Sequence, residues 1–208
     1  MSDHLPTTLP APDDGRRAAI VNVVADVLHA RNGATSIETI LTTTATSPHE
    51  VAREFGSAGA LMAAVARTLA EQMLSPLEEG PTATSFRPRL IEFSRRATDE
   101  YLGLRLKNLY RIALADGTRD VAIAREVYSQ GPERVHAALA RFFRAARCAG
   151  VMLEADSDRL ANCFMALLRT YWDLSDLRGA PDRRITERDV GGLVEVFLTG
   201  VQTEAGHA

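Results

Sequence analysis

Apolar residues recur at helical spacing along almost the whole chain, and this pattern constrains the fold more than any other feature. Ile20, Val24 and Leu28 near the start are four residues apart, and so are Phe197 and Val201 near the end. No stretch shows the strict alternation of a half-buried strand, and no hairpin signal joins two short apolar runs. The sequence therefore predicts an all-α protein.

Capping and turn residues divide this pattern into separate helices. Thr186 and Asp189 have the spacing of a capping box, and Gly80-Pro81 ends a helix in the first half. The expected helices span residues 16–31, 36–44, 48–55, 57–77, 86–102, 104–115, 118–149 with an interruption at 130–132, 156–178 and 186–203.

Charge and cysteine content exclude several classes of protein. The 208 residues carry a net charge of -3 with a single lysine, Lys107, which does not fit a general polyanion binder. No apolar run is long enough for a membrane span and no secretory signal is visible, so we expect a cytoplasmic protein. Cys148 and Cys163 lack metal-ligand spacing, and we interpret them as small core residues. We expect no metal and no cofactor.

The stretch TSPHEVAREFGS, residues 46–57, predicts a short helix with a thin apolar anchor. Ser47 can cap it, Pro48 suits its first position and Gly56 ends it. Val51 and Phe55 are its only large apolar residues, at i and i+4. Such a helix is rarely present for packing alone, so its other face is expected to meet a partner.

The line RRAAIVNVVADVLHARNGATSIETILTTTATSPHEVAREFGSAGALMAAV resembles the N-terminal domain of TetR-type (TetR/AcrR) transcriptional regulators. The similarity is one of spacing: a first helix ends in Asn32-Gly33, a second opens near Ser36, and Ser47 caps a third. It extends more loosely over GPERVHAALARFF, ADSDRLANCFMALL and VEVFLTG. The resemblance implies a flexible arm (1–15), a helix-turn-helix domain (16–56), and a connecting helix with an effector-binding and dimerisation domain (57–208).

In this family residues 36–55 form the helix-turn-helix, whose second helix enters the DNA major groove as half of a dimer. The candidate DNA-binding residues implied by the resemblance are Thr35, Ser36, Ser47, Pro48, His49, Glu50 and Arg53. Arg53 suits both phosphate and guanine, although an i, i+3 ion pair with Glu50 is the alternative. For Thr35, Ser36 and Ser47, helix capping is the alternative role.

Several positions depart from the family pattern. Ala45 stands where a turn glycine is common, Ala52 replaces a phosphate-contacting tyrosine, and Ala58 replaces a lysine. Glu50 and Glu54 are expected to add negative charge to the reading face. Residues 16–75 contain five arginines and five acids, a net charge of zero. We therefore expect weak DNA binding outside the operator, since phosphate contacts supply most non-specific affinity.

The C-terminal part carries the remaining candidate residues. Aromatic walls with a few polar groups suit a small-effector cavity, as the resemblance implies. The candidate effector-binding residues, for which plain core is the alternative, are Phe93, Tyr101, Tyr110, Phe142, Met165, Arg169 and Trp172. Two apolar helices from each subunit would form the dimer interface, and its candidate residues are Leu160, Phe164, Leu168, Val194, Phe197, Leu198 and Val201.

These features predict a homodimeric DNA-binding regulator rather than an enzyme. We find no phosphate-binding loop, nucleophile elbow or HExxH motif. By resemblance the protein is a repressor that binds a palindromic operator and is released by a small-molecule effector. The alternative is a dimeric ligand- or protein-binding module on the same scaffold that has lost sequence-specific DNA binding.

Overall fold

The computed structural model describes residues 13–29, 36–99, 101–173 and 186–201, with the side chains of 170–173 left aside. The described residues are largely helical. The helices are α1 (Asp14–Val27), α2 (Ile37–Thr43), α3 (Pro48–Phe55), α4 (Ala58–Leu74), the 3-10 helix η1 (Ser75–Leu77), α5 (Phe86–Thr98), α6 (Leu102–Gly117), α7 (Val121–Gln130), α8 (Pro132–Cys148), α9 (Ser157–Asp173) and α10 (Glu187–Thr199). The all-α prediction is confirmed.

Local capping explains where the helices differ from their expected limits. Asp13 accepts a hydrogen bond from Gly15 N, so α1 begins at Asp14, inside the stretch expected to be an arm. Asp99 accepts hydrogen bonds from the backbone of Tyr101, Leu102 and Gly103, which starts α6 two residues early and ends α5 at Thr98. The expected capping box at Thr186 is confirmed, whereas Asn32-Gly33 lies outside the described residues.

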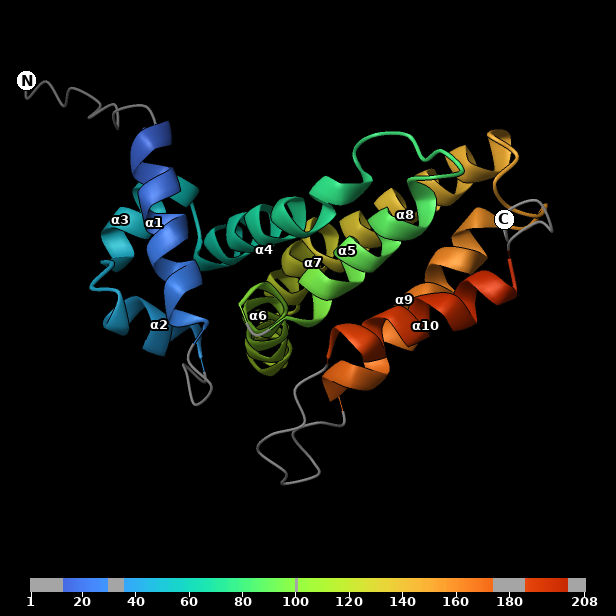
Figure 1. Ribbon diagram of the computed structural model, residues 1–208. Coiled ribbons are helices and arrows are strands. Elements are labelled where there is room, and N and C mark those ends of the chain that lie inside the picture. The colour runs from blue at the N-terminus through green and yellow to red at the C-terminus, as the bar shows by residue number, and fades with distance from the viewer. Residues whose placement is uncertain (1–12, 30–35, 100, 174–185, 202–208) are drawn as a thin grey trace, which may run out of the picture.

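Helices α1, α2 and α3 form a small unit, here called the head, at one end of the molecule (Figure 1). Its core contains Ile20, Val24, Ile40 and Val51, which are at most 4% exposed. Leu61 on α4 is fully buried as well, and α4 packs against both α1 and α3. Burial of each large aliphatic side chain stabilises such a unit by about 1.5–3 kcal/mol, which offsets the short length of α2 and α3.

Helix α4 runs from the head into a second bundle formed by α5 to α10 (Figure 1). An aromatic cluster fills the distal part of this bundle. Its members are Phe86, Phe93, Phe142, Phe143, Phe164 and Phe197, all at most 6% exposed. Ring centroids of Phe164 and Phe197 lie 4.8 Å apart, in an edge-to-face arrangement that aromatic pairs prefer. None of the described helices is long and apolar enough to span a membrane.

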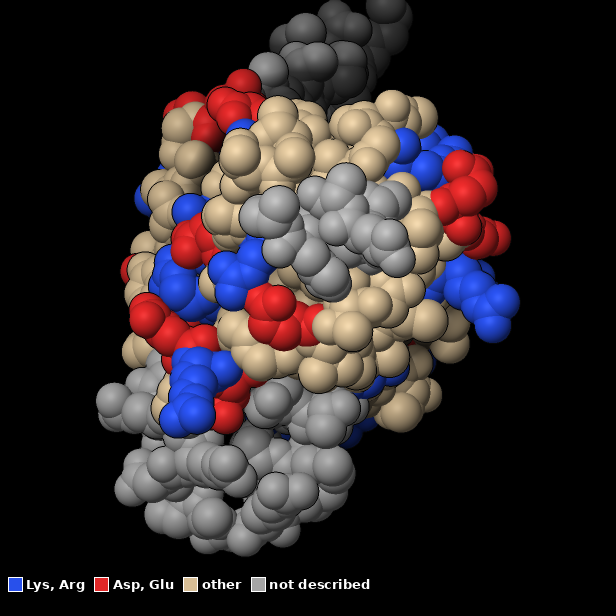
Figure 2. Space-filling model, turned by 45° about the vertical axis from the view of Figure 1, so that its right-hand side comes forward, with Lys and Arg blue, Asp and Glu red and all other residues tan. Residues whose placement is uncertain are grey.

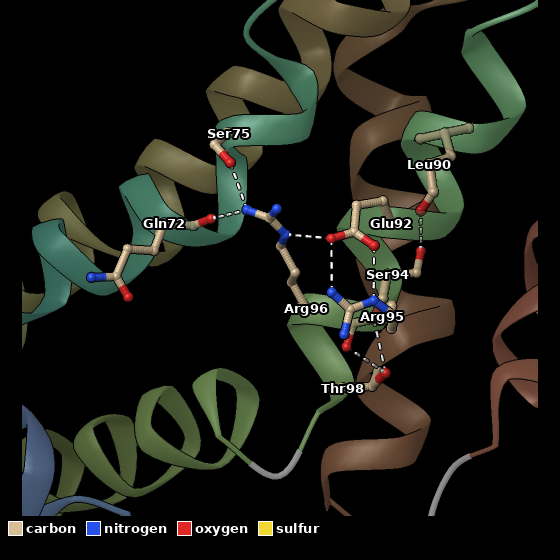
Figure 3. Close-up of polar contacts among 8 residues, drawn as sticks. All are labelled: Gln72, Ser75, Leu90, Glu92, Ser94, Arg95, Arg96 and Thr98. Carbon is tan, nitrogen blue, oxygen red and sulfur yellow. Dashed lines mark hydrogen bonds and ion pairs between the residues drawn. The ribbon is translucent and has the colours of Figure 1, made fainter.

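Polar contacts join the far end of α4 to α5 (Figure 3). Arg96 donates to the carbonyl oxygen of Gln72 at 2.8 Å and to Oγ of Ser75 at 2.5 Å, where α4 passes into η1. Glu92 accepts from Arg95 at 2.8 Å and from Arg96 at 2.7 Å. The Arg95 hydrogen bond is the main cause that lowers the pKa of Glu92 to about 2. Helix α5 therefore holds the end of α4 that lies farthest from the head.

Candidate DNA-binding surface

The turn between α2 and α3 contains a strained residue. Ala45 has a φ of 51°, a left-handed conformation that costs an L-residue other than glycine about 1 kcal/mol. Its backbone N–H donates to the carbonyl oxygen of Thr42 at 3.2 Å, and the next N–H, of Thr46, donates to Leu41 at 3.0 Å. These bonds and the burial of Thr46 hold the turn closed. Ala45, which stands where a turn glycine is common in the family, thus adopts a positive φ without being glycine.

The rear of α3 is held by three side chains. Val51 is 3% exposed in the head core, and the half-buried Phe55 ring lies 5.2 Å from the guanidinium of Arg17. Glu54 is only 4% exposed, and it accepts from the backbone N–H of Asp13 at 3.1 Å. The prediction that Glu54 adds charge to the reading face is therefore wrong. Sequence periodicity does not predict this burial, because Glu54 is covered by the N-terminus of α1 at Asp13, which lies 41 residues earlier in the chain.

Arg53 and Glu50 are both engaged inside the head. Arg53 Nε donates to Glu54 at 2.7 Å, which is the main cause that lowers the pKa of the Glu54 carboxyl. The expected alternative partner of Arg53, Glu50, instead accepts from Arg16 Nε on α1 at 2.6 Å. Arg16 and Arg53 thus each already have a carboxylate beside them. The side chain of Arg53 is still 34% exposed and that of Arg16 52% exposed.

The front of α3 is open at its first turn. Ser47, Pro48 and His49 are exposed, and Oγ of Ser47 accepts from the backbone N–H of Glu50 at 3.1 Å. At the start of α2, Ser36 caps in the same way, accepting from Thr39 N at 3.2 Å. Thr35 lies outside the described residues. Helix α3 therefore has a buried rear face and an exposed first turn on the outer side of the head.

Comparison with known proteins identifies this architecture. Residues 88–200, more than half of the chain, match the model of the AefR-like transcriptional repressor C-terminal domain, a TetR-type domain. The chain belongs to the TetR family of transcriptional regulators. TetR-family regulators bind DNA operators and small-molecule effectors and form dimers. Membership confirms the expected function, a DNA-binding transcriptional repressor, and no finding favours the alternative in which DNA binding is lost.

Solved structures show the same fold over nearly the full chain. The flavonoid-responsive regulator FrrA is 28% identical, with a TM-score of 0.60 over 91% of this chain and 99% of its own. A TetR transcriptional regulator from Agrobacterium tumefaciens is 20% identical, with a TM-score of 0.67 over 94% and 98%. SmeT, the repressor of the Stenotrophomonas maltophilia multidrug efflux pump SmeDEF, is 17% identical, with a TM-score of 0.59 over 92% and 93%. No curated protein sequence matches the chain.

The expected effector-binding residues of this TetR-family protein whose side chains are described lie in different surroundings. Phe93 and Phe142 are buried in the aromatic cluster, and Met165 is half-buried. Tyr110 packs at the side of the core, where burial raises the pKa of its phenol. Tyr101 is 54% exposed and Arg169 is exposed, and the side chain of Trp172 is outside the described set.

A groove of about 840 Å³ lies along α8 instead, beside the end of α4 and the turn that follows η1. Phe142 is its only lining residue from the predicted effector set. Leu74 and Leu77 supply apolar lining, while Glu71 and Arg134 face each other across it with a 2.9 Å ion pair. Sequence periodicity does not predict this groove, because its two walls come from segments such as those of Glu71 and Arg134, which are 63 residues apart in the chain.

The last two helices pack within their own subunit. The expected interface residues Phe164, Leu168, Val194, Phe197, Leu198 and Val201 are at most 9% exposed, and Leu160 is half-buried. A second chain is therefore not needed to cover them, and that part of the prediction is wrong. Helices α5 and α8 cover them, for example through Phe143, whose ring centroid lies 5.3 Å from that of Phe197.

The outward faces of α9 and α10 carry small and weakly polar residues instead. Val196 is 69% exposed on α10, near the exposed Gly192, and Cys163 and Ala166 are exposed on α9. Figure 2 brings this end of the molecule forward and shows a broad area of uncharged residues bordered by charged ones. Cys163 and Cys148 are both free and exposed, so the interpretation of the cysteines as core residues is wrong.

Proposed function

We propose that this TetR-family regulator represses transcription as a homodimer that binds a palindromic operator through the exposed first turn of α3. The observation that carries the proposal is the exposure of Ser47, Pro48 and His49 on a helix whose rear is buried. In this arrangement Ser47 and Arg53 would meet phosphates, and Pro48 and His49 would meet base edges. Ser36, which caps α2, and Thr35, which precedes it in the sequence, are further candidate phosphate contacts.

Residues 16–56 would serve as the DNA-binding domain, and residues 57–208 as the effector-binding and dimerisation domain. The outward faces of α9 and α10 are the proposed dimer interface, since Gly192 and Ala166 would allow close helix approach around Val196. Two heads in one dimer must reach successive major grooves about 34 Å apart. The operator would consequently have two-fold symmetry.

A small-molecule effector would bind in the second domain and change the separation of the two heads. The groove along α8 is the proposed entry to this site, with Phe142 at its edge. The relative FrrA is flavonoid-responsive, which supports an organic effector for this chain as well. An effector that binds one arrangement of the two heads more tightly than the other, by about 1–3 kcal/mol, would be sufficient to release DNA.

A mobility-shift titration with the DNA upstream of the chain's own gene, at two salt concentrations, tests the proposal. We expect specific binding of the full-length protein at low salt, with a shallow decrease as salt rises, since Arg16 and Arg53 on the head are each paired with a carboxylate. Absence of any shift at low salt would contradict the proposal and favour a binding module without DNA recognition.

A further inference from the structure

Among the described residues, three hydrogen bonds join helix α6 to the head. Arg105 Nη2 donates to Oδ1 of Asp26 at 2.6 Å, Asn108 Nδ2 donates to the carbonyl oxygen of Leu28 at 2.8 Å, and the backbone N–H of Ile37 donates to Oδ2 of Asp116 at 2.9 Å. The first two bonds hold the end of α1, and the third holds the start of α2. One face of α6 therefore grips two helices of the head.

Burial of Arg105 costs free energy that a purely structural contact would not require. Its side chain is 7% exposed, whereas that of its carboxylate partner Asp26 is 70% exposed and so attracts it only weakly. Its Nε is buried and has no hydrogen-bond acceptor among the described residues. The guanidinium stacks on the ring of Tyr101 at 3.7 Å, and that ring in turn lies 5.5 Å from His29. The folded protein would be at least as stable with an apolar residue of similar length at this position. Burial of the guanidinium charge costs free energy, and an ion pair with one exposed carboxylate does not offset that cost.

We infer that Arg105, together with Asn108 and Asp116, is a positioning latch that sets the orientation of the head on α6, and that Arg105 is retained for this orientation rather than for stability. The inference rests on the proposed function, because orientation of the head matters only if two heads bind one operator. The latch residues themselves do not touch DNA.

The geometry makes the latch sensitive to small movements of α6. Two of its bonds satisfy backbone groups at helix ends, Leu28 C=O and Ile37 N–H, and such bonds weaken steeply with distance and angle. Helix α6 is itself tightly fixed to α5, since a Cβ at Gly103 would lie only 2.4 Å from the carbonyl oxygen of Ala97. A shift of the effector domain would therefore pass through this corner to the latch.

The first test compares the Arg105→Met variant of the full-length protein with wild type. We expect binding to the upstream DNA between about five- and twentyfold weaker, with a melting temperature that is unchanged or higher. Amide hydrogen exchange should become faster in the peptide that ends at Leu28. Arg125→Met, on the exposed side of α7, is the matched control for loss of one arginine. A lower melting temperature with unchanged exchange at α1, or unchanged DNA affinity, would overturn the inference.

The Asp26→Ala variant, which removes the acceptor of the Arg105 hydrogen bond, separates loss of the latch from loss of an acid. Removal of an acid from the head should by itself strengthen DNA binding, as we expect for the control Glu38→Ala on α2, whereas loss of the latch should weaken it several-fold. Tighter binding by Asp26→Ala would overturn the inference. If wild type binds no DNA, the proposed function fails, and faster exchange at α1 in both variants still decides whether Arg105 holds the head.

Discussion

The guanidinium of Arg16 on α1 donates through both Nε and Nη2 to one carboxylate oxygen of Glu50 on α3. This pair joins the first helix of the head to the proposed recognition helix, and the side chain of Glu50 is only 17% exposed. The cation on α1 is thus balanced by an acid in the same head. The pair gives a physical reason to expect weak non-specific DNA binding, since Arg16 on the head is already paired with an acid.

Removal of this acid should increase non-specific affinity. In Glu50→Gln, Arg16 is free to meet a phosphate, so we expect tighter binding to unrelated duplex DNA. The slope of log affinity against log salt should steepen by about one unit per head. Fluorescence anisotropy at several salt concentrations measures both, with Glu133→Gln on α8 as a control far from the head. An unchanged slope would show that Arg16 does not reach DNA.

The strained turn can be relieved by glycine. Ala45→Gly removes the cost of a positive φ, and we expect the free energy of unfolding to rise by about 0.5–1 kcal/mol even after the entropy that glycine adds to the unfolded chain. Ala52→Gly, at an exposed helical position of α3, should instead lower it by about 1 kcal/mol. Chemical denaturation of both variants checks the difference, and equal effects would contradict the strain at Ala45.

The Glu92 network should make stability depend on acid pH. The pKa of Glu92 is about 2 in the folded protein, below the ordinary value of 4.5 that applies when unfolded. Its contribution is therefore complete above about pH 4.5 and is lost as pH falls toward 2. Because the side chain is 35% exposed, we expect Glu92→Gln to cost only about 1 kcal/mol at pH 7. Thermal unfolding at pH 7 and pH 3 should show the difference shrinking, and a constant difference would contradict it.

The proposed dimer interface can be disrupted on α10. Val196→Asp places two like charges near the two-fold axis, and we expect at least about 2 kcal/mol weaker dimerisation. Val121→Asp is the matched control, since Val121 is 57% exposed on α7. Sedimentation or size-exclusion measurements at low protein concentration distinguish monomer from dimer. If the Val196→Asp protein remains as dimeric as the control, the interface lies elsewhere.

Local signals in the sequence predicted the fold well and the site in part. Helical periodicity and the caps at Ser47 and Thr186 depend only on residues that are close in the sequence. The bounds of α3 and the start of α10 were therefore predicted closely. The burial of Glu54 depends on α1 folding back over α3, which no local pattern contains. Periodicity likewise showed that Phe164 is buried, but it does not distinguish cover by α8 and α5 from cover by a second chain.

In the proposed function, the first turn of α3 reads DNA. Binding of wild-type protein and of His49→Ala to the upstream operator and to unrelated duplex, measured in parallel by anisotropy, tests it most directly. We expect His49→Ala to lose about 1–3 kcal/mol of operator binding while its affinity for unrelated duplex and its melting temperature stay unchanged. Equal operator affinity for the two proteins would contradict the claim that this turn lies against the bases.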